Sequence, residues 1–267
     1  MAALHFPFKV LIQGTELPLD GLAALIPPIG FTATRIGGLM LGLPLVGFEI
    51  APARIRGLGV VVLSLVFGFS VPTTVMPTSI AGAMAGELML GLMLGLVVRM
   101  VLASVEMAGT LIGMHAGFNF ANTIDPLMKE HSNPLSVIMT SLAGLLLFIS
   151  GGYHDILRAL GASLRVLPPG TLEFQPGWTH FLLERANELF INGLRLALPI
   201  VLVIFATHIA FALLSRVGQQ LNLWAIGFIF TIGAGILALA VFSDTLFAEI
   251  NHLLDQGLRD LAQILTE

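Results

Sequence analysis

Three ionisable residues stand inside a long apolar stretch of the sequence: Glu87, Arg99 and Glu106. A charged group in an apolar helix is costly to bury, so it usually pairs with another group or faces water. Arg99 and Glu106 are seven residues apart, which places them on roughly the same face of a helix. Two interpretations remain open. These residues form ion pairs that fix the register of packed helices, or they line a wet, polar conduit.

The other residues that could do chemistry are scattered. The seven histidines are dispersed along the chain, and there is no cysteine. The sequence has no HExxH, GxSxG or phosphate-loop motif. Asp125 and Asp155 could form a carboxylate pair, but Asp125 precedes a proline in a loop and Asp155 is expected to open a helix. We therefore expect no enzyme, no metal site and no cofactor.

The composition is that of a protein embedded in lipid or in a protein assembly. Of the 267 residues, 56% are hydrophobic and only 10% are charged, with a mean hydropathy of +0.95. Soluble domains carry about 25% charged residues, so much of this chain's surface must meet lipid or other protein. The net charge is −4 and the basic residues are scattered, which argues against nucleic acid as a partner.

The apolar segments are of helical length and predict an all-α protein. Residues 22–48 are broken by Pro27, Pro28 and Pro44, which predicts two short helices or one kinked helix. The segment 117–134 is rich in turn-forming residues and predicts a loop. Further helices are expected over 57–69, 81–113, 135–150, 155–167, 180–214 and 223–242.

From Asp244 the pattern changes to that of an amphipathic helix, with acidic residues off the apolar face. Because a helix lying on a membrane surface is usually basic, we expect this tail to dock on protein. Its apolar face consists of Leu246, Ile250, Leu253, Leu254, Leu258, Leu261 and Ile264.

Small residues recur at a spacing typical of helices that pack closely in lipid. Gly91 and Gly95 form one GxxxG pair, and Gly109 and Gly113 begin a run that continues to Gly117. They serve packing within this chain or against partner chains, and both alternatives remain open. Methionines recur every seven residues, which predicts either gap-filling in a core or a deformable surface facing a pore or a moving partner. These are Met93, Met100, Met107 and Met114.

The stretch from Met114 to Pro126, MHAGFNFANTIDP, resembles the most characteristic motif of the FliR family, the export-gate proteins of bacterial flagellar type III secretion. The resemblance covers nearly the whole chain after residue 30. The chain departs from the family at residues 217–220, where a proline is usual, and at Tyr153, where a second histidine is common. The other agreeing segments, in the right order, are Pro44 with 50–56, 86–95, 152–154, 167–170, 193–199 and 220–222.

The resemblance implies an all-α, membrane-associated fold of helical hairpins. Residues 1–175 would be shaped like the partner protein FliP, and residues 176–267 like the FliQ hairpin followed by the amphipathic tail. The chain would complete a helical ring with FliP and FliQ in the bacterial inner membrane, in contact with membrane lipid, at the flagellar basal body. Unfolded flagellar proteins would pass through this ring, and the tail would contact the export component FlhB.

The loop 117–126 is the best candidate for a plug that keeps such a gate shut. Gly117 frees the backbone, and Asp125 followed by Pro126 stiffens the exit. Two phenylalanines supply bulk and two asparagines offer side-chain hydrogen bonds. A plain connector is the alternative. The plug residues are Gly117, Phe118, Asn119, Phe120, Ala121, Asn122, Asp125 and Pro126.

Two other functions remain open. A gate subunit of a virulence injectisome would share the fold and the mechanism. An ion-coupled secondary transporter would use Glu87, Arg99 and Glu106 as its ion site.

Overall fold

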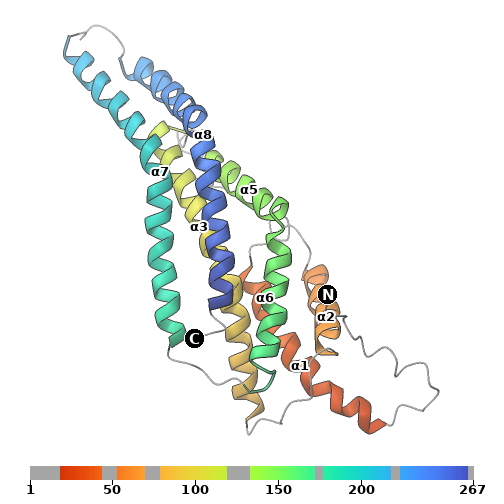
Figure 1. Cartoon of the computed structure of the whole chain (residues 1–267). Helices are drawn as coiled ribbons and strands as arrows, with labels where there is room; N and C mark the ends of the chain where they lie inside the picture. Colours follow the sequence, from red (N-terminus) through yellow and green to blue (C-terminus); the bar gives the residue numbers. More distant parts are fainter. Residues whose placement is uncertain are drawn as a thin grey trace. The chain divides into compact units, whose positions relative to one another are not determined.

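The computed structural model describes residues 19–43, 53–69, 79–118, 133–171, 177–217 and 223–263. Within these ranges all regular structure is α-helical, as expected (Figure 1). Three helices, α3, α7 and α8, are long and apolar enough to cross a membrane, and α5 with α6 would add a fourth if they form one broken span. The helices are α1 (Leu19–Gly42), α2 (Ala53–Gly68), α3 (Ile80–Ala116), α5 (Pro134–Ile149), α6 (Gly152–Val166), α7 (Gly177–Val217) and α8 (Leu223–Gln263).

The chain divides into two compact units that interleave along the sequence. The first comprises Met1–Leu96, Ile156–Pro176 and Leu261–Glu267, and the second comprises Val97–Asp155 and Gly177–Asp260. The long helix α3 therefore contributes its first half to one unit and its second half to the other. The expected division has a single boundary, after residue 175, between a FliP-like part and a FliQ-like part. It concerns resemblance to those two proteins and remains a prediction.

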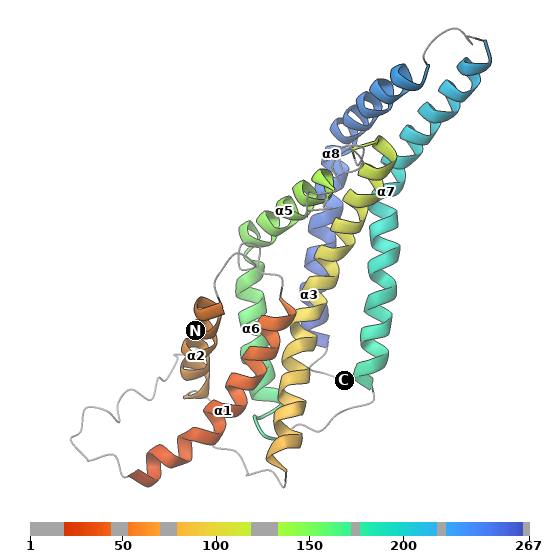
Figure 2. The same cartoon turned by 180° about the vertical axis from the view of Figure 1, so that it is seen from behind.

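In the first unit, α1 packs backbone to backbone against the first half of α3 (Figure 2). Gly42 and Gly95 meet directly, and a Cβ atom added to Gly42 would lie 2.9 Å from the Cα of Gly95. A Cβ on Gly38 would collide with the carbonyl oxygen of Leu88, and one on Gly91 with that of Arg35. Glycines are needed here because any side chain would push the two helices apart.

The helices α2 and α6 complete the first unit. A Cβ on Gly68 at the end of α2 would lie 2.9 Å from Cγ1 of Ile29 in α1. A Cβ on Gly161 of α6 would lie 3.2 Å from the ring of Phe67 in α2. The side chains of Ile156, Leu160 and Leu164, at helical spacing on α6, are buried in this unit. One face of α6 is thus apolar and packed, as its amphipathic sequence requires.

The segment around Pro27 and Pro28 forms one continuous helix, rather than two short ones. Each proline removes a backbone donor and weakens the helix locally. The following turns of α1 hold the segment, because the side chains of Phe31, Ile36 and Leu39 are buried at 5% exposure or less. Tertiary packing therefore overrides the local break that the prolines favour.

The second unit is built from the second half of α3 together with α5, α7 and α8. In both views α7 and α8 run side by side as a hairpin (Figures 1 and 2). A Cβ on Gly193 of α7 would lie 2.9 Å from the carbonyl oxygen of Ser104 in α3. A Cβ on Gly235 of α8 would lie 2.9 Å from Cβ of Ala116, at the other end of that half-helix. Small residues thus also set the packing distances in this unit.

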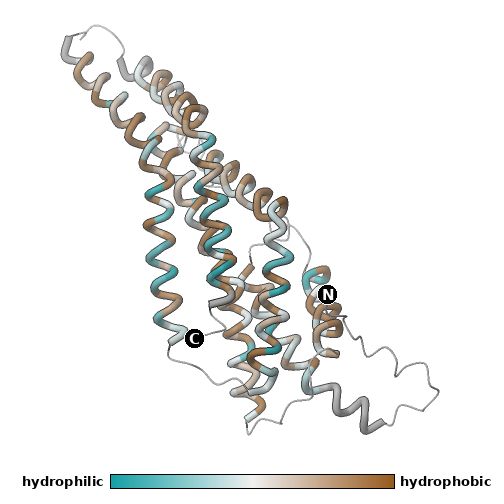
Figure 3. Tube along the Cα trace, in the orientation of Figure 1, coloured by the Kyte–Doolittle hydropathy of each residue, from teal (hydrophilic) through white to brown (hydrophobic). Residues whose placement is uncertain are grey.

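The two halves of α7 differ in polarity (Figure 3). The first half carries charged residues, among them Glu184, Arg185 and Glu188, whereas the second half is almost entirely apolar. Many of the apolar side chains are exposed on this chain. They include Leu198, Leu202, Phe205, Ile209, Leu213 and Leu214 on α7, and Ile229, Phe230, Ile236, Leu237 and Val241 on α8.

The amphipathic tail is continuous with the preceding apolar helix, since α8 runs unbroken from Leu223 to Gln263. Its apolar face was expected to dock on a neighbouring component, and this expectation is wrong for most of the face that the structure describes. Leu246, Ile250, Leu253, Leu254 and Leu261 are at most 9% exposed within this chain. The helical periodicity identified the apolar face of the tail. It could not indicate whether this chain or another protein covers that face. Ile264 lies outside the described residues.

Candidate functional site

The helix α3 ends immediately before the candidate plug loop, and its end is built on Gly117. The amide of Phe118 donates to the carbonyl of Gly113 at 2.9 Å, and the amide of Gly117 donates to that of Met114 at 3.3 Å. These two bonds form a Schellman motif, whose C′ residue takes a left-handed conformation. Gly117 has φ +86°, which glycine adopts without strain. The sequence therefore stops the helix at this residue and turns the chain.

The turn at Gly117 is also sterically tight. A Cβ added to Gly117 would lie 2.9 Å from the ring of Phe228 in α8. A cavity of about 470 Å³ opens beside this contact, between the end of α3, α7 and α8. Its wall is mostly apolar, with two histidines. The lining residues are Met114, His115, Ala116, Gly117, His208, Phe211, Gly227, Phe228 and Thr231.

Of the plug candidates, the structure describes Gly117 and Phe118. Both are half-buried in this chain. The remaining ones, Asn119, Phe120, Ala121, Asn122, Asp125 and Pro126, lie outside the described residues. The plug therefore stays a prediction, with its starting point in place at the end of α3.

The helix α5 packs against the glycines in the second half of α3. A Cβ on Gly109 would lie 2.7 Å from the Cα of Ser136, and one on Gly113 would collide with the side chain of Asn133. Asn133 caps α5 by accepting from the amide of Leu135 at 3.0 Å, and its Nδ2 donates to the carbonyl of Thr110 at 3.1 Å. One buried amide thus starts α5 and ties it to α3. All four predicted packing glycines, Gly91, Gly95, Gly109 and Gly113, contact helices of this chain.

Glu87 lies in a buried polar network in the first unit, at the start of α3. Its Oε2 accepts from Nε of Arg35 at 2.6 Å, and neither side chain has any exposed surface. Its Oε1 accepts from the amide of Gly170 at 2.9 Å. Arg35 donates further, to the hydroxyl of Ser163 at 3.1 Å and to the carbonyl of Leu167 at 2.9 Å. Burial of this pair is possible because nearly every polar atom finds a partner.

Arg99 and Glu106 have a different environment from Glu87. Both side chains are exposed on this chain. Glu87 is therefore an internal ion-pair residue, whereas a polar lining remains a prediction for Arg99 and Glu106. The methionine repeat is similarly divided, since Met93 is 1% exposed and Met114 is 47% exposed. Among the described residues, no group of three histidine, aspartate or glutamate side chains could hold a metal ion.

Comparison with known proteins decides the family. The profile of the bacterial export proteins, family 1, matches residues 26–257. This chain belongs to the FliR family of bacterial export proteins. It is 30% identical to the flagellar biosynthetic protein FliR of Pectobacterium carotovorum over 87% of this chain and 90% of that protein. It is 31% identical to FliR of Escherichia coli K12, over 62% of this chain and 63% of that protein.

The chain is also similar to a protein that is named for a secretion system. The secretion system apparatus protein SsaT of Salmonella typhimurium is 27% identical over 45% of this chain and 47% of that protein. Membership in a family of export proteins, together with its long apolar helices, places this chain in a membrane.

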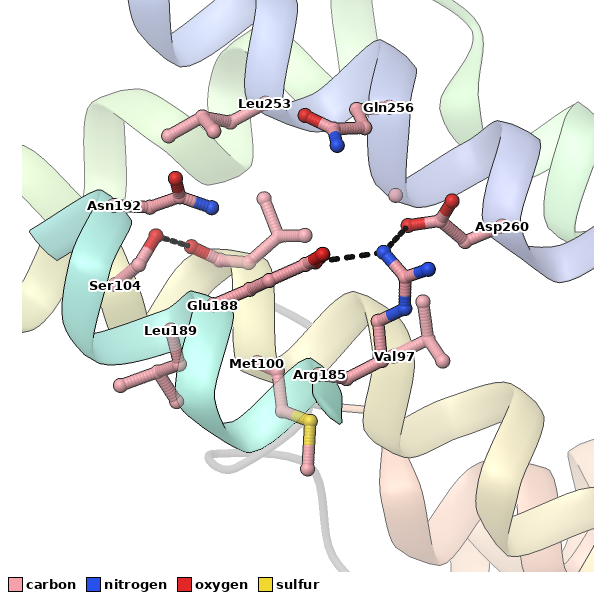
Figure 4. Close-up of a pocket in the computed structure, with 12 residues that line it drawn as sticks. Val97, Met100, Ser104, Arg185, Glu188, Leu189, Asn192, Leu253, Gln256 and Asp260 are labelled. Carbon is pink, nitrogen blue, oxygen red and sulfur yellow. Dashed lines mark hydrogen bonds and ion pairs between the residues drawn. The ribbon is translucent and has the colours of Figure 1, made fainter. Parts of the chain in front are cut away.

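Sequence reasoning missed a second ion-pair cluster in this FliR-family chain (Figure 4). Arg185 of α7 donates from Nη1 to Glu188 at 2.6 Å and to Asp260 of α8 at 2.8 Å. Its guanidinium also lies 5.1 Å from the centroid of the Phe181 ring. The amides of Asn192 and Gln256 line the same small cavity, of about 30 Å³. The cluster joins the start of α7 to the end of α8, and its two partners are 75 residues apart in the sequence. No local sequence pattern could therefore have indicated it.

Proposed function

We propose that this chain is a subunit of the flagellar type III export gate. It forms with FliP and FliQ a helical ring in the bacterial inner membrane, at the flagellar basal body, and FlhB contacts this assembly. Unfolded flagellar proteins leave the cell through the ring. Support comes from the FliR relatives, above all the protein of Pectobacterium carotovorum that matches across 90% of its length.

The observation that carries the proposal is the exposed apolar surface of the hairpin. On α8 alone, Ile229, Leu237 and Val241 are 66–70% exposed. A single chain in water does not leave such a surface uncovered, so lipid or other helical subunits must cover it. Packing against like hairpins in a ring would bury the same apolar faces that α7 and α8 leave open.

We further propose that the segment beginning at Gly117 is the plug of the gate. The Schellman turn directs the chain away from the axis of α3 at this residue. The contact of Gly117 with Phe228 links the root of the segment to the α7–α8 hairpin. A plug needs a fixed root and a free tip, and this arrangement supplies the root.

The other two functions have less support. The support for an injectisome subunit comes from SsaT, whose match covers less than half of either chain. A transporter would need an accessible ion site, and Glu87 is fully buried in a pair with Arg35.

Gene deletion separates the three functions. If the proposal holds, a deletion strain lacks filaments and does not secrete hook or filament proteins, and the wild-type gene restores both. Normal flagella with loss of secreted virulence proteins would assign the chain to an injectisome. Ion-coupled uptake by vesicles that contain this chain alone would assign it to the transporters. Either result would overturn the proposal.

A further inference from the structure

The helix α2 (Ala53–Gly68) leaves most of its surface open. Its packed side is narrow: Ser64 is 3% exposed, and Phe67 and Gly68 meet the neighbouring helices α6 and α1. The Ser64 hydroxyl donates to the carbonyl of Val60 at 2.7 Å within the helix. Its burial therefore requires no hydrogen-bond partner from another helix. Val60 and Leu63 are partly covered, and six other large side chains are 41–64% exposed. They are Ile55, Leu58, Val61, Val62, Leu65 and Val66.

The charge of α2 is all at one end and all of one sign. Arg54 and Arg56 are exposed in its first turn, and the helix contains no acidic residue. Within the described part of the chain, neither arginine takes part in an ion pair. An apolar helix whose cations at one end pair with no described residue is complementary to an interface that is apolar inside and anionic at its rim.

The length of α2 fits such an interface. Its 16 residues span about 24 Å at the rise of an α-helix, and the hydrocarbon core of a bilayer is about 30 Å thick. With Arg54 and Arg56 at the level of the headgroups, the whole apolar face would lie within hydrocarbon. Arginine stems can lie along apolar surface while the guanidinium reaches the headgroups.

The kind of side chain on this face favours lipid over a partner helix. Where α1 meets α3 in the same unit, the contact is made by glycines such as Gly42 and Gly95. Close helix packing in membranes uses small residues of this kind. The exposed face of α2 instead carries bulky, branched residues, which suit fluid acyl chains. The small residues on this face are Gly57 and Gly59, near the arginines, and an added Cβ at either would have nothing within 4 Å.

We infer that α2 is a lipid-facing helix whose Arg54 and Arg56 bind the headgroups of anionic phospholipids. This goes beyond the proposed export function, because it assigns a lipid class to one helix and requires only that the chain resides in a membrane.

The absence of cysteine from the chain allows a clean test with one introduced label. Val62→Cys, on the exposed face of α2, carries a fluorophore in the full-length protein with whatever subunits co-purify. The protein is placed in nanodiscs of phosphatidylcholine with a minority of brominated phosphatidylglycerol or, separately, brominated phosphatidylcholine. We expect stronger quenching by the brominated phosphatidylglycerol. The R54Q/R56Q variant should lose this excess, by about fivefold in local enrichment per arginine, and R54K/R56K should keep it.

Matched controls make each outcome decisive. The ratio of quenching by the two lipids in R54Q/R56Q supplies the reference value, because that variant keeps the label and the helix and loses only the two charges. Equal quenching at Val62→Cys would overturn the headgroup assignment, and no quenching by either lipid would show that protein covers α2. Gly57→Leu should leave quenching and subunit co-purification unchanged, whereas a closely packed partner helix would be displaced by it. Co-purification of subunits is measured separately from quenching. If the export proposal fails, the quenching result therefore still tests the assignment of lipid to α2.

Discussion

The Nε atom of Arg35 in α1 lies 2.6 Å from Oε2 of Glu87 in α3, and both side chains are fully buried. The pair connects these two helices to the end of α6, because Arg35 also donates to Ser163 and Leu167 and Glu87 accepts from the amide of Gly170. A charge pair without access to water must be complete to be tolerated. The first unit is therefore sensitive to the loss of either partner.

Removing one member of this pair should be more damaging than removing both. Arg35→Leu leaves a buried, unpaired carboxylate and should cost about 3–5 kcal/mol of stability. The double variant Arg35→Leu/Glu87→Leu should recover much of that loss. Thermal unfolding of the detergent-solubilised protein measures both effects. The charge swap Arg35→Glu/Glu87→Arg should not rescue, because the carbonyl of Leu167 and the amide of Gly170 would then face the wrong groups. Equal stability of single and double variants would contradict this account.

Two adjacent glycines of α1 offer a matched test of the helix contact. Gly38→Ala would place a Cβ against the backbone of Leu88, whereas a Cβ on Gly37 meets nothing within 4 Å. We expect Gly38→Ala to destabilise by about 1–3 kcal/mol or more through overpacking. Gly37→Ala should be neutral or stabilising by up to about 1 kcal/mol, because alanine is the better helix former. The comparison is read from the same unfolding measurement, and similar values for the two variants would refute the contact.

Gly117 should tolerate almost no substitution. Any side chain meets both the left-handed backbone and the ring of Phe228. The backbone term alone costs about 1–2 kcal/mol for Gly117→Ala, and Gly117→Asp adds a charge beside an aromatic ring. We expect Gly117→Asp to block secretion and swimming in soft agar. Gly117→Ala combined with Phe228→Ala should recover in part, since only the steric conflict is removed. Normal swimming of Gly117→Asp would argue against a tight turn at this position.

Deletion of residues 118–122 tests the plug itself. The segment would no longer close the conduit, so small ions should pass when no protein is being exported. Conductance of the expressed assembly, measured in planar bilayers or as ion leak in cells, should rise above that of wild type. Substitution of the exposed Asp255 of α8 by asparagine serves as a control, because it removes a carboxylate outside the predicted conduit lining and leaves the segment intact. Unchanged conductance after the deletion would identify the segment as a plain connector.

The sequence alone was enough to locate the helices and the start of the loop, because these depend on local chemistry. Gly117 ends α3 where the turn signals began, and α5 starts at Pro134, within a residue of the expected start. Partners distant in sequence could not be obtained in this way. Glu87 was grouped with Arg99 and Glu106 by spacing along one helix, yet its partner Arg35 lies 52 residues away. Likewise, the periodicity of the tail identified its apolar face but not that this chain covers Ile250 and Leu254.

Isolation of the tagged chain in mild detergent tests the central claim most directly. If the exposed faces of α7 and α8 are covered by companion subunits, FliP and FliQ should co-purify with the chain in one assembly. Replacing Leu237 and Val241, both strongly exposed, by charged residues should release the companions while leaving the buried networks of the chain in place. A stable, monodisperse monomer that binds neither FliP nor FliQ would contradict the account.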